Sequence, residues 1–345
     1  MMGVSTPNET QVGSLMCEDI PLPCVSQQVL DFLSHYDSYI IIGHREPDGD
    51  CVCSCLALSS FLKRHGKKVF LLSAGPFAKT EVVPYQSLFT DELPDVDKSS
   101  TGLVVLDCAG IDRVGKSLSP LLVGFPTTII DHHATNAATD DSQSNLILKN
   151  SPSTTYLVQS IIEAVDGSVS KEEAHLLFLG LACDTGFFRH LDGRSANVFL
   201  AASRLIAAGA NPKKVFAEMN GGKSIASRLI LSRILSRMQT FYDGRLVVSY
   251  ETYDDVQEFG TYSRDSDTTY MVIQSIANVE AIVLLRQESM THCSIGFRSL
   301  DRIDVSRVAK EFGGGGHIQA SGAYKEGTVQ ELIPLIVKAF DSDFM

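Results

Sequence analysis

Residues 39–50 of the chain read Tyr-Ile-Ile-Ile-Gly-His-Arg-Glu-Pro-Asp-Gly-Asp, an apolar run followed by a polar turn. The apolar run predicts a buried strand, because β-branched side chains pack well on a sheet. A proline and a glycine in the second half favour a tight turn. We therefore expect His44, Asp48 and Asp50 to converge at the carboxyl end of this strand, where open α/β sheets bind ligands.

These three side chains form a mixed nitrogen and oxygen ligand set. Such a set suits Mn²⁺, Mg²⁺ or Zn²⁺ and lacks the thiolates of a structural zinc site. A polar surface turn explains this stretch alone equally well, since such turns commonly follow strands. Comparable polar groups after other predicted strands favour the metal site.

The composition is that of an ordinary globular protein, with 345 residues, 44% of them hydrophobic and 20% charged. This length allows two domains, each with its own core. No apolar run approaches the ~18 residues of a transmembrane helix, and the first residues lack the features of a secretory signal. We expect a cytoplasmic protein that binds no membrane and keeps its eight cysteines reduced.

The formal net charge of the chain is −12, and the sequence contains no run of lysine and arginine. Long nucleic acids are bound mainly by basic surfaces that neutralise phosphates. We therefore expect no binding of duplex DNA. Any nucleotide that the protein binds should be short, with bound metal supplying the local positive charge.

Strand and helix patterns alternate along the first two thirds of the chain. After the first strand, further strands are expected at 68–73, 102–106 and 127–130. Helices are expected at 25–35, 51–65, 153–165 and 171–182, with Asp50 as the N-cap of the second. This alternation predicts an α/β fold, with an N-terminal, mostly parallel, doubly wound sheet and helices on both of its faces.

A pair of glycines at 221–222 marks a break, after which the alternation restarts on a smaller scale. We expect a smaller C-terminal α/β domain that faces the first domain across a cleft. The predicted divisions are an N-terminal extension (1–24), a catalytic domain (25–219), a linker helix (220–241) and a C-terminal substrate-binding domain (242–345).

Acidic residues and histidines also follow later elements of the predicted sheet. Asp107 ends one strand, Asp131, His132 and His133 follow the next, and Asp184 follows an apolar helix. The carboxyl ends of parallel strands meet at one edge, so these groups can converge. Four carboxylates balance two divalent cations, and they repel one another strongly without metal. The predicted metal ligands are His44, Asp48, Asp50, Asp107, His132 and Asp184.

Four motifs of this sequence resemble those of the DHH phosphoesterase family. They are Gly-His-Arg-Glu-Pro-Asp-Gly-Asp (43–50), Leu-Asp-Cys-Ala (106–109), Asp-His-His-Ala-Thr-Asn (131–136) and Ala-Cys-Asp-Thr-Gly-Phe-Phe-Arg (182–189). The glycine-rich segment Phe-Gly-Gly-Gly-Gly-His-Ile-Gln-Ala-Ser-Gly (312–322) resembles the signature of the C-terminal domain associated with that family. The resemblance is closest to the NrnA-like branch of nanoRNases, phosphoadenosine-phosphate phosphatases and dinucleotide-cleaving enzymes.

The resemblance implies two divalent cations, most often Mn²⁺, and a homodimer. It assigns one ion to His44, Asp48 and Asp107, and the other to Asp50, Asp107, His132 and Asp184. It also implies that His133 contacts the scissile phosphate and that Asp131 orients a neighbouring histidine. Two residues depart from the family pattern, which often has a glycine at Cys53 and a glutamate near Tyr156.

The glycine-rich segment is a candidate substrate-binding loop, since glycine backbone can approach a phosphate closely. A flexible hinge is the alternative interpretation of four consecutive glycines. Arg298 lies at a predicted strand end, and we expect it to bind a terminal phosphate bidentately. The predicted substrate-binding residues are Arg298, Gly315, Gly316, His317 and Ser321.

The sequence thus predicts a Mn²⁺-dependent phosphoesterase that uses two metals to activate water. The expected substrates are short oligoribonucleotides and 3′-phosphoadenosine 5′-phosphate. Linear or cyclic di-adenylate, polyphosphate and pyrophosphate are the alternative substrates. A non-catalytic nucleotide or metal sensor ranks last, because all six expected ligands are present.

Overall fold

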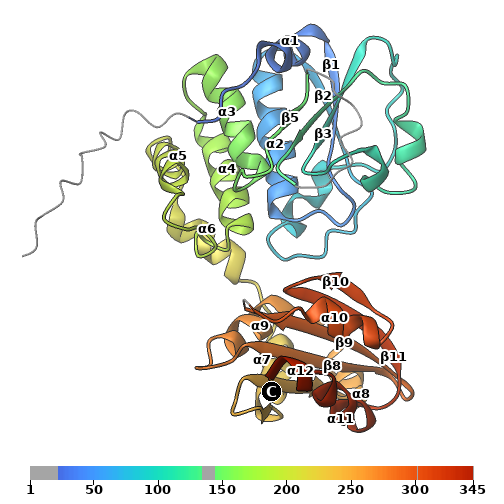
Figure 1. The fold of residues 1–345 in the computed structure, drawn as a ribbon. Helices are drawn as coiled ribbons and strands as arrows, with labels where there is room; N and C mark the ends of the chain where they lie inside the picture. The colour runs from blue at the N-terminus through green and yellow to red at the C-terminus, as the bar shows by residue number, and fades with distance from the viewer. Residues whose placement is uncertain (1–21, 134–143, 301, 345) are drawn as a thin grey trace, which may run out of the picture. The chain divides into compact units, whose positions relative to one another are not determined.

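The computed structural model describes residues 22–133, 144–300 and 302–344. The predicted N-terminal extension therefore lies almost entirely outside the described residues. Contacts divide the chain into two compact units, Met1–Gly222 and Lys223–Met345, each built around its own sheet (Figure 1).

The first unit contains a sheet of five parallel strands in the order β2-β1-β3-β4-β5. The strands are β1 (Ser38–Ile42), β2 (Lys68–Leu72), β3 (Thr101–Leu106), β4 (Thr127–Asp131) and β5 (Leu146–Ile147). This order has its topological switch point between β1 and β3, where ligands bind in open α/β sheets. The predicted parallel sheet is confirmed, whereas the two-residue strand β5 was not predicted.

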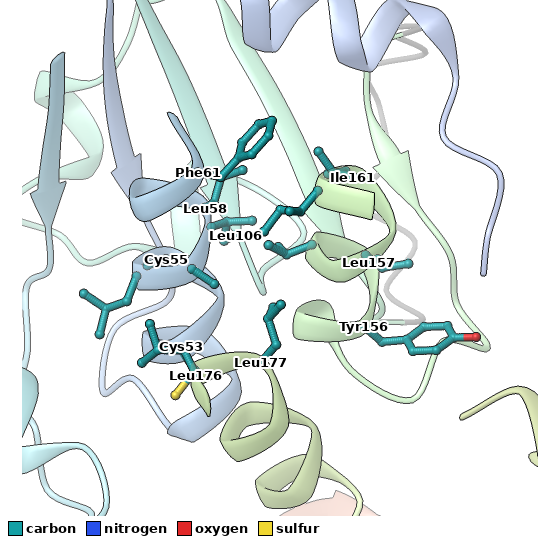
Figure 2. Close-up of a cluster of buried hydrophobic side chains, with 14 of the residues drawn as sticks. Cys53, Cys55, Leu58, Phe61, Leu106, Tyr156, Leu157, Ile161, Leu176 and Leu177 are labelled. Carbon is teal, nitrogen blue, oxygen red and sulfur yellow. The ribbon is translucent and has the colours of Figure 1, made fainter. Parts of the chain in front are cut away.

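The described residues of this unit form six α-helices. They are α1 (Gln27–His35), α2 (Gly49–Arg64), α3 (Thr154–Asp166), α4 (Lys171–Asp184), α5 (Ala196–Ala207) and α6 (Pro212–Asn220). Figure 2 shows how Leu58 of α2, Leu157 of α3 and Leu177 of α4 gather beside Leu106 of β3. Helices α2, α3 and α4 therefore share one apolar cluster with one face of the sheet.

A different kind of structure covers the other face. There, Leu103 and Val105 of β3 pack with Val114 and Leu118 in a second apolar cluster. Val114 and Leu118 lie in the segment that contains two short 3₁₀-helices, η2 (Ile111–Arg113) and η3 (Ser119–Leu121). The predicted α/β class is confirmed, with short 3₁₀-helices on this second face.

The start of α2 corrects one prediction. Asp48, and not Asp50, is the N-cap residue, and its Oδ1 accepts hydrogen bonds from the backbone N–H groups of Asp50 and Cys51, both at 3.1 Å. Asp50 lies in the first turn of the helix, where its carboxylate is directed toward α3 instead. The helix begins two residues earlier than the sequence pattern indicates.

The second unit contains a six-stranded mixed sheet in the order β10-β11-β9-β8-β7-β6. Its strands are β6 (Gln239–Phe241), β7 (Leu246–Glu251), β8 (Ala281–Ser289), β9 (His292–Ser299), β10 (Gly315–His317) and β11 (Ala320–Glu326). Its helices are α7 (Ile225–Ser236), α8 (Tyr253–Phe259), α9 (Ser266–Gln274), α10 (Val305–Glu311), α11 (Val329–Ala339) and α12 (Asp341–Phe344). This smaller α/β unit agrees with the predicted fold class, although β6, α8, β10 and α12 were not predicted.

Helix α7 occupies most of the predicted linker. Its Ile230 and Ile234 pack in one apolar cluster with Val247 of β7 and Leu284 of β8. The contacts of α7 therefore place it with the second unit. None of the helices in the described part of the chain combines the length and the apolar character that a membrane crossing requires.

Candidate metal centre

The parallel sheet brings the predicted ligands to the carboxyl ends of three neighbouring strands. His44 follows β1 by two residues, Asp107 comes directly after β3, and Asp131 is the last residue of β4. The backbone of Asp107 is left-handed, with φ of 60°. A non-glycine residue in that conformation costs on the order of 1 kcal/mol or more. Such strain is concentrated at functional sites, and here it falls on the central carboxylate of the cluster.

The Asp107 carboxylate lies between two imidazole rings. Its Oδ2 is 3.5 Å from Nε2 of His44, and its Oδ1 is 3.5 Å from Nε2 of His132. The side chain is almost completely buried. Because each oxygen faces a different histidine, one carboxylate can be shared by two cations, as the sequence predicts.

The surroundings of His132 fit a metal ion. Its Nδ1 pairs with the carbonyl oxygen of Ser151 at 3.1 Å, so the ring can donate there and present the lone pair of Nε2 to the site. In the described part of the chain, Nε2 is buried without a hydrogen-bond partner. It lies 4.0 Å from Asp50 Oδ2 and 3.5 Å from Asp184 Oδ2. Two ligand atoms that share a cation at ~2.1 Å each are at most ~4.2 Å apart, so these separations suit a shared ion.

His44 is oriented in the same way. Its Nδ1 pairs with the carbonyl oxygen of Arg45 at 2.8 Å, which leaves Nε2 to face Asp107 and, at 3.9 Å, Asp48. Both histidines therefore use one nitrogen on the backbone and direct the other toward carboxylates. This is the usual arrangement of histidines that bind metals.

The N-terminus of α3 holds the Asp50 carboxylate in place. The backbone N–H of Thr154 donates to Oδ2 at 2.6 Å, and Thr155 donates to Oδ1 through its N–H at 2.9 Å and its hydroxyl at 2.6 Å. The Thr154 hydroxyl also donates to Oδ1 of Asp107 at 2.9 Å. A helix N-terminus stabilises negative charge. These two threonines were not predicted as part of the site, although they directly follow Ser153, the N-cap of α3.

Asp131 and His133 form a second pair beside this cluster. Oδ1 of Asp131 is 2.7 Å from Nδ1 of His133 and accepts hydrogen bonds from the backbone N–H groups of His132 and His133. Burial alone would raise the pKa of Asp131, but the hydrogen bond to His133 lowers it below its ordinary value. The same bond raises the pKa of His133. Asp131 thus fixes the ring of His133, whose Nδ1 lies 3.7 Å from Asp107 Oδ1.

The carboxylates are electrostatically strained in the absence of a cation. Burial, followed by repulsion from Asp50, raises the pKa of Asp184 to about 7. Burial also raises the pKa values of Asp50 and Asp107. A bound divalent cation offsets this repulsion and favours the ionised carboxylates. The charge distribution therefore fits a metal centre.

Within the described residues, three groups bring potential metal-binding atoms within 4.8 Å of one another. They are His44–Cys51–Asp107, Asp107–His132–His133 and Asp50–His132–Asp184. Asp48 is the predicted ligand that falls outside these groups, since its Oδ1 caps α2. Cys51 is present in one group, although the sequence analysis treated it only as a reduced cysteine.

The predicted substrate-binding residues lie on adjoining strands of the second unit. Gly316 of β10 pairs with Ser321 of β11, and Ala320 of β11 pairs with Arg298 of β9. The Arg298 guanidinium lies over the ring of Tyr270, 4.5 Å from its centroid. His317 is exposed, whereas the Ser321 hydroxyl is buried and donates to the His317 carbonyl oxygen at 2.8 Å. The glycine run is therefore part of a hairpin, in which Ser321 stabilises the turn.

Comparison with known families finds one family domain in each of the two units. Residues 38–181 match the model for the DHH family, N-terminal domain, and residues 243–344 match the model for the DHHA1 domain. The chain carries a DHH domain and a DHHA1 domain. The DHH domain includes the strand ends that carry His44, Asp107 and His132, and the DHHA1 domain includes Arg298 and the glycine hairpin.

The chain is similar to several proteins that are named as enzymes. The chain is 27% identical over 288 residues to the bifunctional oligoribonuclease and PAP phosphatase NrnA of Thermus thermophilus. The aligned region covers 83% of the chain and 84% of the relative. It is 23% identical over 337 residues to the cyclic-di-AMP phosphodiesterase PdeA of Listeria monocytogenes, which covers 92% of the chain but 49% of the relative. The chain thus spans about half of that second enzyme.

A solved structure shows the same fold. The exopolyphosphatase-related protein of Bacteroides fragilis superposes with a TM-score of 0.76 at 23% identity, covering 93% of this chain and 97% of that protein. The enzyme class predicted from the sequence, a phosphoesterase, is confirmed by the DHH and DHHA1 domains and by the relatives.

Proposed function

We propose that this protein is a Mn²⁺-dependent phosphoesterase that hydrolyses short oligoribonucleotides to mononucleotides and converts 3′-phosphoadenosine 5′-phosphate to AMP. The observation that carries the proposal is the Asp107 carboxylate, which faces His44 with one oxygen and His132 with the other. This geometry suits two cations that share one ligand. The similarity to NrnA over most of both chains supports the choice of substrates.

In this proposal, the metal ligands are those predicted from the sequence. His44, Asp48 and Asp107 hold the first cation, and Asp50, Asp107, His132 and Asp184 hold the second. Bound divalent cations activate a water molecule and neutralise phosphate charge. A ligand set dominated by carboxylates with some imidazole fits Mn²⁺.

The remaining residues of the site position these ligands and the phosphate. Thr154 and Thr155 keep the Asp50 carboxylate directed toward His132 through three hydrogen bonds. Asp131 keeps the His133 ring beside Asp107, where it contacts the scissile phosphate. His133 is half-exposed, so a substrate can reach it.

In the DHHA1 domain, we assign substrate binding to Arg298, Gly315, Gly316, His317 and Ser321. The backbone of the glycine hairpin lacks side chains that would block a phosphate. Ser321 contributes through the shape of the turn, since its hydroxyl already donates to His317. We expect the active form to be a homodimer, which sedimentation or light scattering of the purified protein checks.

The similarity to PdeA favours a second candidate function, the hydrolysis of cyclic or linear di-adenylate by the same metal centre. The two candidates share their ligands and differ only in the nucleotide that is bound. A direct comparison of substrates therefore separates them.

The test is to incubate the full-length protein with Mn²⁺ and, separately, with a dinucleotide RNA, a long RNA, 3′-phosphoadenosine 5′-phosphate, cyclic di-AMP, pApA and pyrophosphate. We expect rapid release of mononucleotide from the dinucleotide and of phosphate from the bisphosphate, with slow turnover of the long RNA. Asp107→Asn is the inactive control, because it removes charge from both metal positions. Turnover confined to cyclic di-AMP and pApA would establish the second candidate, and turnover confined to pyrophosphate would refute both.

A further inference from the structure

Cys51 is a buried thiol that belongs to neither apolar core of the first unit. Only 1% of the residue is exposed. The apolar cluster on one face of the parallel sheet contains Cys53 and Cys55, and the cluster on the other face contains Cys108. Neither cluster contains Cys51. Its sulfur interacts with the Cys55 thiol on the same helix and with His44 beyond the end of β1.

The Cys51 sulfur lies between the carboxyl ends of β1 and β3. A Cβ atom added to Gly43 would stand 2.1 Å from the Cys51 Sγ and 3.2 Å from the carbonyl oxygen of Leu106. Gly43 directly precedes His44, and Leu106 directly precedes Asp107. The absence of a side chain at Gly43 therefore makes room for the sulfur beside the first proposed metal position.

Three different donor atoms meet at this point. The sulfur of Cys51, an imidazole nitrogen of His44 and a carboxylate oxygen of Asp107 all lie within 4.8 Å of one another. An ion bonded to a sulfur at ~2.3 Å and a nitrogen at ~2.1 Å holds those atoms at most ~4.4 Å apart. The three atoms then need to approach one another by a few tenths of an ångström at most to share one cation.

We propose that Cys51 is a thiolate ligand of the first metal position, together with His44 and Asp107. This inference rests on the two-metal centre of the proposed function and refines its metal content. On binding, the sulfur–metal bond replaces the S–H bond, and the proton is released to solvent, because the thiolate and not the thiol ligates metals. A single metal replaces a single thiol proton, and no oxidation or reduction takes place.

The consequence is a difference in metal preference between the two positions. Sulfur ligands favour Zn²⁺ and related thiophilic ions, whereas carboxylate and imidazole ligands suit Mn²⁺ and Mg²⁺. The second position is formed by Asp50, His132 and Asp184, which come together without a cysteine among the described residues, and by the shared Asp107. The protein then holds one thiophilic cation and one Mn²⁺ side by side.

Cobalt spectroscopy tests this assignment. The full-length protein is freed of metal by chelation and titrated with Co²⁺, whose thiolate complexes show a strong near-ultraviolet charge-transfer band in addition to visible ligand-field bands. We expect both sets of bands in the wild-type protein. In Cys51→Ala and Cys51→Ser, the charge-transfer band is lost while visible bands from the second position remain. Cys53→Ala, which alters a core thiol two residues away, retains the charge-transfer band.

Metal competition gives an independent measurement. We expect Cys51→Ala to weaken Zn²⁺ binding at one site by about 100-fold or more, because loss of a direct ligand should cost more than the ~10–100-fold found when an outer supporting group is removed. The Mn²⁺ affinity of the other site should change much less. Far-ultraviolet circular dichroism shows whether each variant is folded, and Cys51→Ser keeps the side-chain size if Cys51→Ala does not fold.

Two outcomes overturn the inference. Visible cobalt bands in the wild-type protein without a charge-transfer band would leave the metal centre intact and exclude Cys51 as a ligand. A charge-transfer band that persists in both Cys51 variants would also exclude Cys51 as the thiolate ligand. Failure of the folded wild-type protein to bind any Co²⁺, Zn²⁺ or Mn²⁺ would instead refute the metal centre of the proposed function itself.

Discussion

The hydroxyl of Thr155 donates a hydrogen bond of 2.6 Å to the carboxylate of Asp50, across more than one hundred residues of chain. This bond ties the start of α3 to the start of α2, beside the proposed metal positions. Because the Asp50 carboxylate also accepts the N–H groups of Thr154 and Thr155, its orientation is fixed before any metal binds. The site is therefore preorganised by a helix N-terminus.

Replacing Thr155 by valine tests this role, since valine has the same shape without the hydroxyl. We expect the affinity of the second position for Mn²⁺ to fall by about tenfold or more, as for other groups that orient a metal ligand. Calorimetric titration of the metal-free protein with Mn²⁺ measures the change. Thr155→Ser keeps the hydroxyl and serves as the control, and equal Mn²⁺ affinity in the valine and serine variants would contradict the orienting role.

Asp131 is expected to act through His133. In Asp131→Asn, the ring of His133 loses its charged partner, and we expect kcat to fall by about 10–100-fold while the bound metal content is unchanged. Steady-state kinetics and elemental analysis of the same preparation measure the two quantities. A variant that loses metal instead would show that Asp131 supports the ligands directly.

A double mutant separates the two explanations further. If Asp131 only orients His133, then Asp131→Asn should have little additional effect in a protein that already carries His133→Gln. Additive losses in kcat would mean that the two residues act independently.

Arg298 is expected to bind the end of the substrate and to take no part in the chemical step. Arg298→Ala should therefore raise KM more than it lowers kcat. Arg298→Lys keeps the charge but loses the planar fork, so we expect an intermediate KM. The exposed Lys325→Ala on β11 is the matched control for loss of positive charge. A loss confined to kcat would place Arg298 in the chemistry.

The second unit contains an ion pair whose contribution depends on pH. Asp255 is buried and pairs with Arg233 and Arg237. Burial raises the pKa of Asp255, but the hydrogen bonds to Arg237 and Arg233 outweigh it and hold the pKa well below its usual value. A carboxyl with a lowered pKa stabilises the fold above its unfolded pKa of ~3.9, and this contribution is lost as the pH falls toward the folded value.

We therefore expect Asp255→Asn to lower the free energy of unfolding by about 2–3 kcal/mol at neutral pH, less than the ~3–5 kcal/mol of a fully buried pair because both arginines reach solvent. The difference from wild type should shrink as the pH falls below about 4. Urea unfolding of the second unit at several pH values measures it. A difference that stays constant with pH would show that the asparagine acts through the cap of α8 and not through charge.

The sequence was most informative where a local pattern is enough. Strands β1 to β4 are apolar runs, and the polar residues after them converge because parallel strands end at one edge. The N-cap of α2 was assigned wrongly to Asp50, because Asp48 and Asp50 are both good capping residues and only the geometry of the turn selects between them.

Other features depend on contacts between distant segments. Thr154 and Thr155 contact Asp50 only after α2 and α3 pack together, and nothing near Asp50 in the sequence indicates this. Cys51 resembles the other cysteines of α2 until the strand ends are placed beside it. The glycine run gives no strand pattern, yet it pairs as β10 because β11 offers a free edge.

The left-handed backbone of Asp107 destabilises the fold at a position that the proposed metal centre requires. Glycine would relax that backbone and remove a buried charge, so Asp107→Gly should make the metal-free protein harder to unfold while it destroys the shared ligand. Selection for thermal stability alone would therefore favour glycine over aspartate at this position. Its presence in the chain indicates that the protein has been kept for its chemistry, at the expense of a more robust apoprotein.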